Sequence, residues 1–108
     1  MSGKLSMQEP TFFTLAALVD GPLHGYAIIG RAHELSGRRV RLAAGTLYAA
    51  LERLTAGGLV EVHRTEIVDG RARRSYRLTE AGREALRAEA ARMQSAARTV
   101  LRRLAAQP

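Results

Sequence analysis

Cysteine and tryptophan are absent from this 108-residue chain, and aromatic residues make up only 5% of it. Without cysteine the chain has no disulfide framework, no thiolate zinc ligands and no cysteine nucleophile. Its histidines, His24, His33 and His63, share no metal-ligand spacing, so no metal site is expected. No apolar run approaches the roughly 18 residues of a membrane span, and the first ten residues lack the apolar segment of a secretory signal. We therefore expect a cytoplasmic protein with no membrane partner.

Sequence signatures of catalysis are missing as well. The five serines lie in no nucleophile motif, and there is neither a P-loop nor a glycine-rich dinucleotide turn. No pair of carboxylates stands out as a general acid and base. The chain is therefore predicted not to be an enzyme, and no cofactor is expected.

Acidic residues are scarce relative to basic ones, 10 against 17, which gives a net charge of +7 and a sequence pI near 11.2. Sixteen of the basic residues are arginine, and ten of these lie between residues 31 and 77 beside only five acids. An excess of positive charge in the middle of the chain favours binding to a polyanion such as nucleic acid. A solubilising, arginine-rich surface would give the same composition.

Hydrophobic periodicity predicts two short helices in the first third of the chain. The first helix starts at Pro10 and is broken at residues 20–22. The second begins near His24, with Tyr26 and Leu35 among the side chains on its inner face, and ends at Ser36-Gly37.

The third predicted helix, residues 45–56, has a buried side and an exposed side of different character. Leu47, Leu51 and Leu54 recur at helical spacing and define the buried side. The opposite side, with Tyr48 at its margin, is formed by Gly45, Thr46, Ala49, Glu52 and Arg53. Small residues near its N-terminal end would let the backbone approach base edges, and one α-helix fits the DNA major groove. A helix whose outer side is merely solvated is the alternative.

A hairpin is predicted after Gly57-Gly58, where the hydrophobic period changes from helical to two. Residues 59–68 and 71–78 alternate apolar with polar side chains, and Tyr76 is expected to point into the core. Asp69-Gly70 between them tolerates positive φ and suits a tight turn. The tip of this hairpin, residues 69–74, carries three arginines and one acid.

A last helix is predicted from its cap at Thr79 to about residue 106, about 40 Å in length. The domain upstream is too small to cover such a helix. Six apolar residues follow one another along it at heptad spacing: Leu86, Ala90, Met93, Ala97, Val100 and Leu104. This seam predicts dimerisation, with Phe12, Phe13 and Leu15 of the first helix sharing the interface. Packing of the seam on the first helix of the same chain is the alternative.

The order of these elements predicts an α+β fold that is mainly α with a small β-hairpin. It is a winged helix-turn-helix followed by a long C-terminal dimerisation helix. Residues 1–78 are assigned to the DNA-binding domain and residues 79–108 to the dimerisation helix. The residues expected to contact DNA are Tyr26, Arg38, Arg39, Arg41, Thr46, Tyr48, Ala49, Arg53, Arg71, Arg73 and Arg74.

Different parts of DNA are expected to be contacted by different members of this set. The arginines before the third helix would grip the backbone, and those of the hairpin tip would lie beside or within the minor groove. Arg53 could reach a phosphate or a guanine, and Tyr48 could donate to a phosphate. Tyr26 and Tyr48 could instead lie at the edge of the core with their hydroxyl groups in water.

The stretches "LHGYAI", "GTLYAALERLTAGGLVE" and "DGRARRSYRLTEAG", in this order, resemble the PadR family of bacterial transcriptional regulators. The resemblance covers roughly residues 10 to 83, and the single C-terminal helix is similar to the short branch of that family. It implies a homodimer that binds an inverted-repeat operator in double-stranded DNA, commonly as a repressor released by a small-molecule effector. It also places Thr46 and Tyr48 in the recognition-helix motif, Tyr26 in the second-helix motif, and Arg73, Arg74 and Tyr76 in the wing motif.

Two departures from the family pattern affect the expected function. Ala49 stands where family members often have proline, which makes the third helix more regular. The last helix contains no aromatic residue from Thr79 onward, so a drug pocket of stacked aromatic rings at the dimer centre is not expected. An effector in the dimer cleft would be aliphatic, or there would be none. Two other functions remain open: a winged-helix protein-interaction module and a nonspecific nucleic-acid-binding protein.

Overall fold

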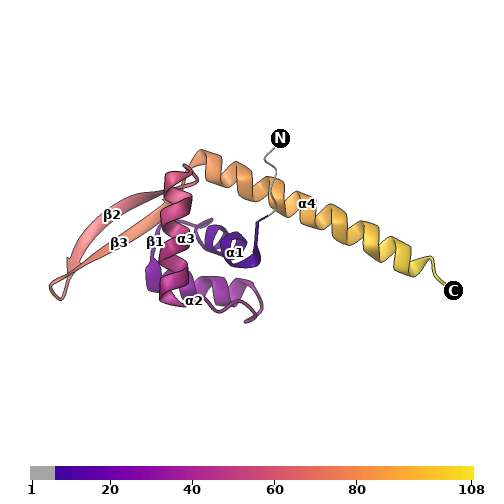
Figure 1. Ribbon diagram of the computed structural model, residues 1–108, viewed down its shortest axis with the longest axis horizontal. Coiled ribbons are helices and arrows are strands. Elements are labelled where there is room, and N and C mark those ends of the chain that lie inside the picture. Colours follow the sequence, from indigo (N-terminus) through magenta and orange to yellow (C-terminus); the bar gives the residue numbers. More distant parts are fainter. Residues whose placement is uncertain (1–6) are drawn as a thin grey trace.

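Four helices and a three-stranded antiparallel sheet make up residues 7–108, the part of the chain that the computed structural model describes. In chain order they are α1 (Glu9–Ala17), β1 (Leu23–His24), α2 (Gly25–Leu35), α3 (Ala44–Ala56), β2 (Val60–Val68), β3 (Arg71–Leu78) and α4 (Glu80–Ala105). Figure 1 shows the hairpin of β2 and β3 projecting to one side of the three short helices and α4 projecting to the other. The predicted α+β fold, a winged helix-turn-helix followed by a long helix, is confirmed. Residues 1–6 of the predicted domain 1–78 lie outside the described residues, and the division at residue 78 stays a prediction.

The sheet has a third strand that the sequence did not predict. Leu23 pairs with Tyr76 and His24 with Ser75, so the strand order is β1-β3-β2. A strand of two residues has no periodicity that could be recognised in a sequence, and only its pairing with β3 defines it. The second helix, predicted to begin near His24, begins at Gly25, and His24 is the capping residue that precedes it.

The core lies where α1, α2 and α3 meet the base of the hairpin. Leu15, Ile28 and Leu47 are wholly buried there, and Val60 of β2 is 1% exposed. Tyr76 is 6% exposed, as its inward alternation predicted. The assignment of Leu15 to the dimer interface was wrong, because a side chain fully enclosed within one subunit has no surface left to offer a partner.

Two side chains of α2 lie differently from the prediction. Tyr26 is 74% exposed and Leu35 is 45% exposed, although both were expected on the inner face. The buried residues of α2 form a narrow stripe of Gly25, Ile28 and Ala32. Tyr26 follows Gly25 by one residue, which turns its side chain about 100° away from that stripe. Leu35 is the last residue of the helix, where the core no longer covers it.

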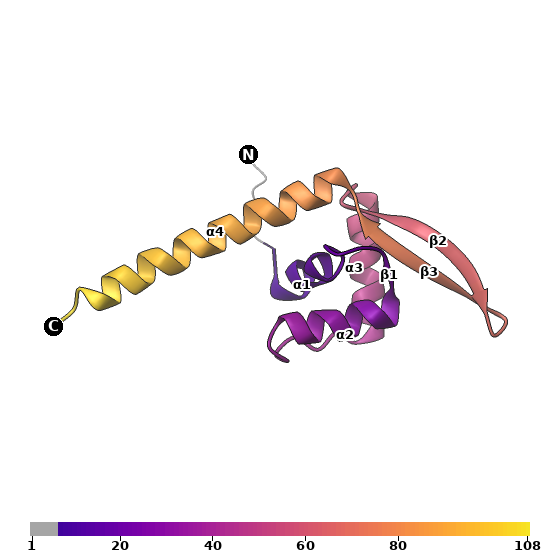
Figure 2. The ribbon, with the colours of Figure 1, turned by 180° about the vertical axis from the view of Figure 1, so that it is seen from behind.

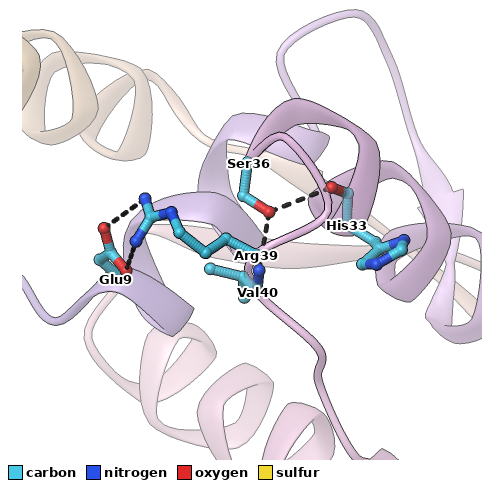
Figure 3. A network of polar contacts seen from close by, with 5 residues as sticks. All are labelled: Glu9, His33, Ser36, Arg39 and Val40. Carbon is cyan, nitrogen blue, oxygen red and sulfur yellow. Dashed lines mark hydrogen bonds and ion pairs between the residues drawn. The ribbon is translucent and has the colours of Figure 1, made fainter.

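The connection between α2 and α3 is held by side chains from three places in the chain (Figure 3). The Ser36 hydroxyl donates to the His33 carbonyl at 3.0 Å and accepts from the Val40 backbone N–H at 2.8 Å. Both guanidinium nitrogens of Arg39 donate to the Glu9 carboxylate of α1 at 2.8 Å. These hydrogen bonds from Arg39 hold the pKa of Glu9 below its ordinary value. The start of α3 is thereby fixed relative to both preceding helices.

The first part of α4 packs against the domain, and the rest does not. Leu86, assigned to the dimer seam, is 8% exposed and packs in the core of the single chain. Its place in a seam between two subunits stays a prediction. Glu89 is also buried; its carboxylate accepts from Arg92 at 2.7 Å and from the Met7 backbone N–H at 3.2 Å. From Ala90 onward every residue of α4 is exposed. Figures 1 and 2 show this stretch extending well beyond α1.

Candidate nucleic-acid interface

One side of α3 is buried and the other is open, as the sequence predicted. Leu47 and Leu51 are at most 1% exposed, whereas Thr46, Ala49 and Arg53 are exposed. α3 stands between α2 and the base of the hairpin in both views (Figures 1 and 2). The exposed side of the helix therefore offers small and polar side chains on a rigid, well-packed element.

Tyr48 lies at the margin of this surface, with its hydroxyl against a glycine of the preceding helix. The Tyr48 hydroxyl and the adjacent ring carbon lie so close to Gly25 that any Cβ at this position would overlap them. Tyr48 is nevertheless 47% exposed, because the contact is made at the edge of the domain. The glycine of "LHGYAI" therefore leaves the space that the end of the "GTLY" tyrosine side chain occupies, and a side chain at position 25 would move this hydroxyl.

The tip of the hairpin is a two-residue turn with the backbone that the sequence predicted. Asp69 and Gly70 have φ values of 52° and 76°, and the flanking residues Val68 and Arg71 are paired. Two consecutive positive φ values define the hairpin turn for which Asp-Gly is favoured. Arg71, Arg73 and Arg74 follow this turn directly and are all exposed.

An extra residue in β2 changes which side chains lie opposite one another in the hairpin. The register shifts between Val62 and Arg64, which leaves His63 without a partner in β3. Because of this extra residue, Thr65 rather than Arg64 lies opposite Arg74. Arg74 shares the inner face with Tyr76, two residues further along β3, whereas Arg71 and Arg73 lie on the outer face.

Two open grooves border α3 on the side of the hairpin. The larger, about 850 Å³, runs between the start of α2, Tyr48 and β3, and Tyr26, Arg73 and Arg74 are among its lining residues. The smaller, about 490 Å³, lies between α3 and the inner face of the hairpin and is lined by residues that include Tyr48, Glu52 and Arg74. Tyr48 and Arg74 border both grooves, so the predicted contacts from the start of α2, from Tyr48 and from β3 adjoin one continuous surface. Thr46, Ala49 and Arg53 of α3 are exposed but line neither groove.

Ion pairing separates the arginines of this surface from most others in the domain. Within residues 7–108, Arg31, Arg39, Arg64 and Arg77 each lie within 4.0 Å of an acidic side chain. No acidic partner within 4.0 Å is found in that range for the remaining arginines of the predicted DNA-contact set, which are Arg38, Arg41, Arg53, Arg71, Arg73 and Arg74. Their charges are available to an external anion. Arg39 is the one member of the predicted DNA-contact set whose guanidinium group is ion-paired in the described residues, with Glu9 as its partner.

A family model for the transcriptional regulator PadR-like family matches residues 14–88, which include α2, α3, the hairpin and the start of α4. The chain belongs to the PadR-like family of transcriptional regulators. It is a regulator and not an enzyme. The motifs that carried the resemblance, from "LHGYAI" to "LTEAG", lie within the matched residues.

Individual relatives agree with the family assignment. Transcriptional regulator Rv3488 of Mycobacterium tuberculosis is 45% identical over 82 residues, which are 76% of this PadR-like chain and 73% of that protein. The structure of Bacillus subtilis PadR in complex with operator DNA is similar with a TM-score of 0.65 and 27% identity, over 74% of this chain and 45% of that one. A PadR-like transcription factor from Bacteroides fragilis has a TM-score of 0.72 and 27% identity, over 86% and 87% of the two chains. This chain thus spans less than half of the Bacillus subtilis protein.

Sequence reasoning missed two features of this PadR-like surface. Gly25 was not singled out, because no local pattern reveals that a tyrosine 23 residues later needs its space. The ion pair between Arg39 and Glu9 joins residues 30 positions apart, so no local pattern in the sequence predicted it either.

In the described part of the chain no three His, Asp or Glu side chains are arranged to hold a metal ion. There is also no helix in that part long and apolar enough to span a membrane.

Proposed function

We propose that this PadR-like chain is a cytoplasmic, homodimeric repressor that binds an inverted-repeat operator in double-stranded DNA. The observation that carries the proposal is the set of arginines around α3 and the hairpin that have no acidic partner within 4.0 Å among the described residues, beside a small-residue helix face. An uncompensated basic surface on a winged helix-turn-helix is the electrostatic footprint of a DNA-binding protein. The operator complex of the related Bacillus subtilis PadR supports the same choice of partner.

In the proposed complex α3 enters the major groove. Thr46 and Ala49 at its exposed side allow the backbone to approach the bases, and Arg53 reaches a guanine or a phosphate. Tyr48, whose hydroxyl lies against Gly25, donates a hydrogen bond to a phosphate, and the exposed Tyr26 does the same from the start of α2. Phosphate contacts of this kind fix the orientation of the helix on the duplex but carry no sequence information.

The remaining arginines hold the DNA on either side of α3. Arg71, Arg73 and Arg74 of the hairpin lie along the flanking backbone or in the minor groove. Arg38 and Arg41 in the connection before α3 contact the backbone. Arg39 would first have to release Glu9, so it contributes less than its two neighbours.

Dimerisation through the exposed part of α4 supplies the two-fold symmetry that an inverted repeat requires. The apolar residues of the seam that remain exposed are Ala90, Met93, Ala97, Val100 and Leu104. Phe12 and Phe13, whose rings pack edge to face with centroids 5.2 Å apart, are half-buried and can extend the same interface. Two recognition helices related in this way would read half-sites about 34–36 Å apart, or a multiple of that distance.

Release by an effector is proposed to act through the angle between the two DNA-binding units. A ligand in the dimer cleft can change DNA affinity only as far as it prefers one dimer geometry over the other. Because α4 has no aromatic residue, such a ligand would be held by aliphatic contacts rather than by ring stacking.

DNase footprinting of the purified protein on the DNA upstream of its own gene, across a salt series, tests this function. A protected inverted repeat that persists at physiological salt supports a sequence-specific dimeric regulator. Diffuse protection that disappears with added salt would indicate a nonspecific nucleic-acid-binding protein, because phosphate contacts alone are strongly salt-dependent. No protection at any salt concentration would favour a protein-interaction module.

A further inference from the structure

Glu52 lies in the middle of the exposed side of α3. With about 100° of rotation per residue, positions separated by three or four residues fall along one line on a helix. The line opposite the buried leucines consists of Gly45, Ala49, Glu52 and Ala56, all of them exposed. Three of these four residues have no side chain beyond a methyl group. Glu52 is therefore the one side chain on this line that can reach outward to a bound molecule.

Glu52 has no ion-pair partner among the described residues, and Arg74 lines the same groove between α3 and the hairpin without pairing with it. No Lys, Arg or His nitrogen of residues 7–108 lies within 4.0 Å of its carboxylate. The residues three and four positions away in the helix are Tyr48, Ala49, Thr55 and Ala56, none of which carries a charge. The acids of β2 differ: Glu61 pairs with Arg77 at 2.6 Å and Glu66 with Arg64 at 3.4 Å.

An unpaired carboxylate on a surface directed at DNA is unfavourable for binding to phosphates. An ionised carboxylate can only accept hydrogen bonds, so it needs a donor from the DNA to offset the repulsion. The major groove offers two such donors, the N4 amino group of cytosine and the N6 amino group of adenine. Adenine places its N7 acceptor beside that donor, whereas cytosine presents the donor alone. Cytosine therefore fits a carboxylate better.

We propose that Glu52 is a specificity-determining residue that accepts a hydrogen bond from cytosine N4 at one position in each half-site. The inference rests on the proposed function, because it requires α3 to lie in the major groove. Glu52 then has two effects on binding: it stabilises the complex where a cytosine donates to it, and it repels the DNA where no donor is present. Discrimination that combines an attractive contact with a repulsive one is how specific interfaces reject wrong partners.

In vitro selection from a random duplex library tests this assignment with four purified full-length proteins: wild type, Glu52→Gln, Glu52→Ala and Glu84→Gln. Wild type is expected to select a symmetric motif with a cytosine at one position of each half-site. Glu52→Gln should select adenine there, because an amide binds adenine N6 and N7 together. Glu52→Ala should show no preference at that position while keeping the rest of the motif. Glu84→Gln makes the same charge change on α4 and should select the wild-type motif.

Affinity measurements on single duplexes give the size of the preference for cytosine at that position. Replacing that cytosine should weaken wild-type binding about five- to tenfold, the lower end of the discrimination given by a base contact, and should not weaken Glu52→Ala. Both Glu52 variants should bind random duplex more tightly than Glu84→Gln does. Thermal melting checks that both are folded, as expected for changes at an exposed site.

Each result decides between the two proposals. If wild type and both Glu52 variants select the same motif, the assignment of Glu52 is overturned and the regulator function stands. If the Glu52 variants change the selection at one position of the motif but wild type selects a base other than cytosine there, the cytosine contact is likewise overturned. If wild type selects no motif at all, the proposed function falls, and the role of Glu52 falls with it.

Discussion

Gly82, in the first turn of α4, lies directly against the backbone carbonyl of Leu59, which connects α3 to the hairpin. A Cβ at position 82 would overlap that carbonyl oxygen, so no residue with a side chain fits without a backbone shift. Thr79 reinforces the junction: its N–H donates to the Leu59 carbonyl at 3.1 Å, and its hydroxyl donates to Gly58 and accepts from Gly82. The direction of α4 relative to α3 and the hairpin is set at this contact.

Gly82→Ala is therefore expected to destabilise the protein and to move α4. A methyl group forced against backbone should cost about 1–3 kcal/mol, and the shift should also weaken binding to an operator whose half-site spacing is fixed. Gly30→Ala is the matched control, because a Cβ at Gly30, in the middle of α2, meets nothing within 4 Å. That control should be neutral or stabilising by about 0.5–1 kcal/mol. Thermal denaturation and operator titration measure both effects, and equal melting temperatures for the two variants would disprove the contact.

Removing a hairpin arginine should weaken binding to every DNA sequence. Arg73→Ala and Arg74→Ala are each expected to lower the slope of log affinity against log salt by about 0.9, the value for one lost phosphate contact. Arg77→Ala, in the same strand, is the control, because Arg77 is ion-paired with Glu61 and should change the slope little. Fluorescence anisotropy across a salt series gives the slopes. A control variant that loses as much as the other two would show that ion pairing does not separate these arginines.

Arg53→Ala tests the recognition helix rather than the hairpin. Loss of a guanine contact should cost about 1–3 kcal/mol at the operator and relax preference at one base pair. Loss of a phosphate contact would instead weaken all sequences equally and reduce the salt slope. Titration of operator and random duplex with the same variant distinguishes these two roles. Unchanged affinity for both duplexes would remove Arg53 from the interface.

Val100→Glu is expected to produce monomers that lose the operator. Val100 is 55% exposed in the single chain, and burying an unpaired carboxylate in a dimer seam would cost on the order of 2 kcal/mol or more for each subunit. Thr99→Glu places the same charge on the neighbouring residue, which lies on the opposite side of α4, and should leave the dimer intact. Light scattering after gel filtration gives the mass of each variant. A dimeric Val100→Glu would show that the seam is not the interface.

Acid should weaken the attachment of α4 through Glu89. The hydrogen bonds from Arg92, and to a smaller extent the one from the Met7 backbone, hold the pKa of Glu89 below its ordinary value against the opposing effect of burial. A carboxylate with a lowered pKa in the folded state contributes stability above its ordinary pKa, and loses it as the pH falls through the lowered value. The melting temperature of the wild type should therefore fall more steeply than that of Glu89→Gln below about pH 4.3. Parallel pH curves for the two proteins would contradict this role.

The sequence by itself determined the type and order of the main elements. Leucines at helical spacing defined α3, alternation defined the hairpin, and Asp69-Gly70 defined its turn, because each signal involves residues that are close in the chain. The three arginines of the hairpin tip were also predicted from the sequence, since they follow the turn directly, but only the structure shows which arginines have an acidic partner.

The tertiary structure alone decided which side chains are available to a partner. Leu15 and Leu86 fitted the predicted interface in the sequence, yet the packing of α1 and α4 encloses them in the core. In the sequence Arg39 looks as available to DNA as Arg38 and Arg41, but in the fold it forms an ion pair with Glu9, 30 residues earlier. The pairing of β1 and the extra residue at His63 likewise depend on a partner strand. Contacts between distant segments follow from how whole elements pack, and no local pattern of residues contains that information.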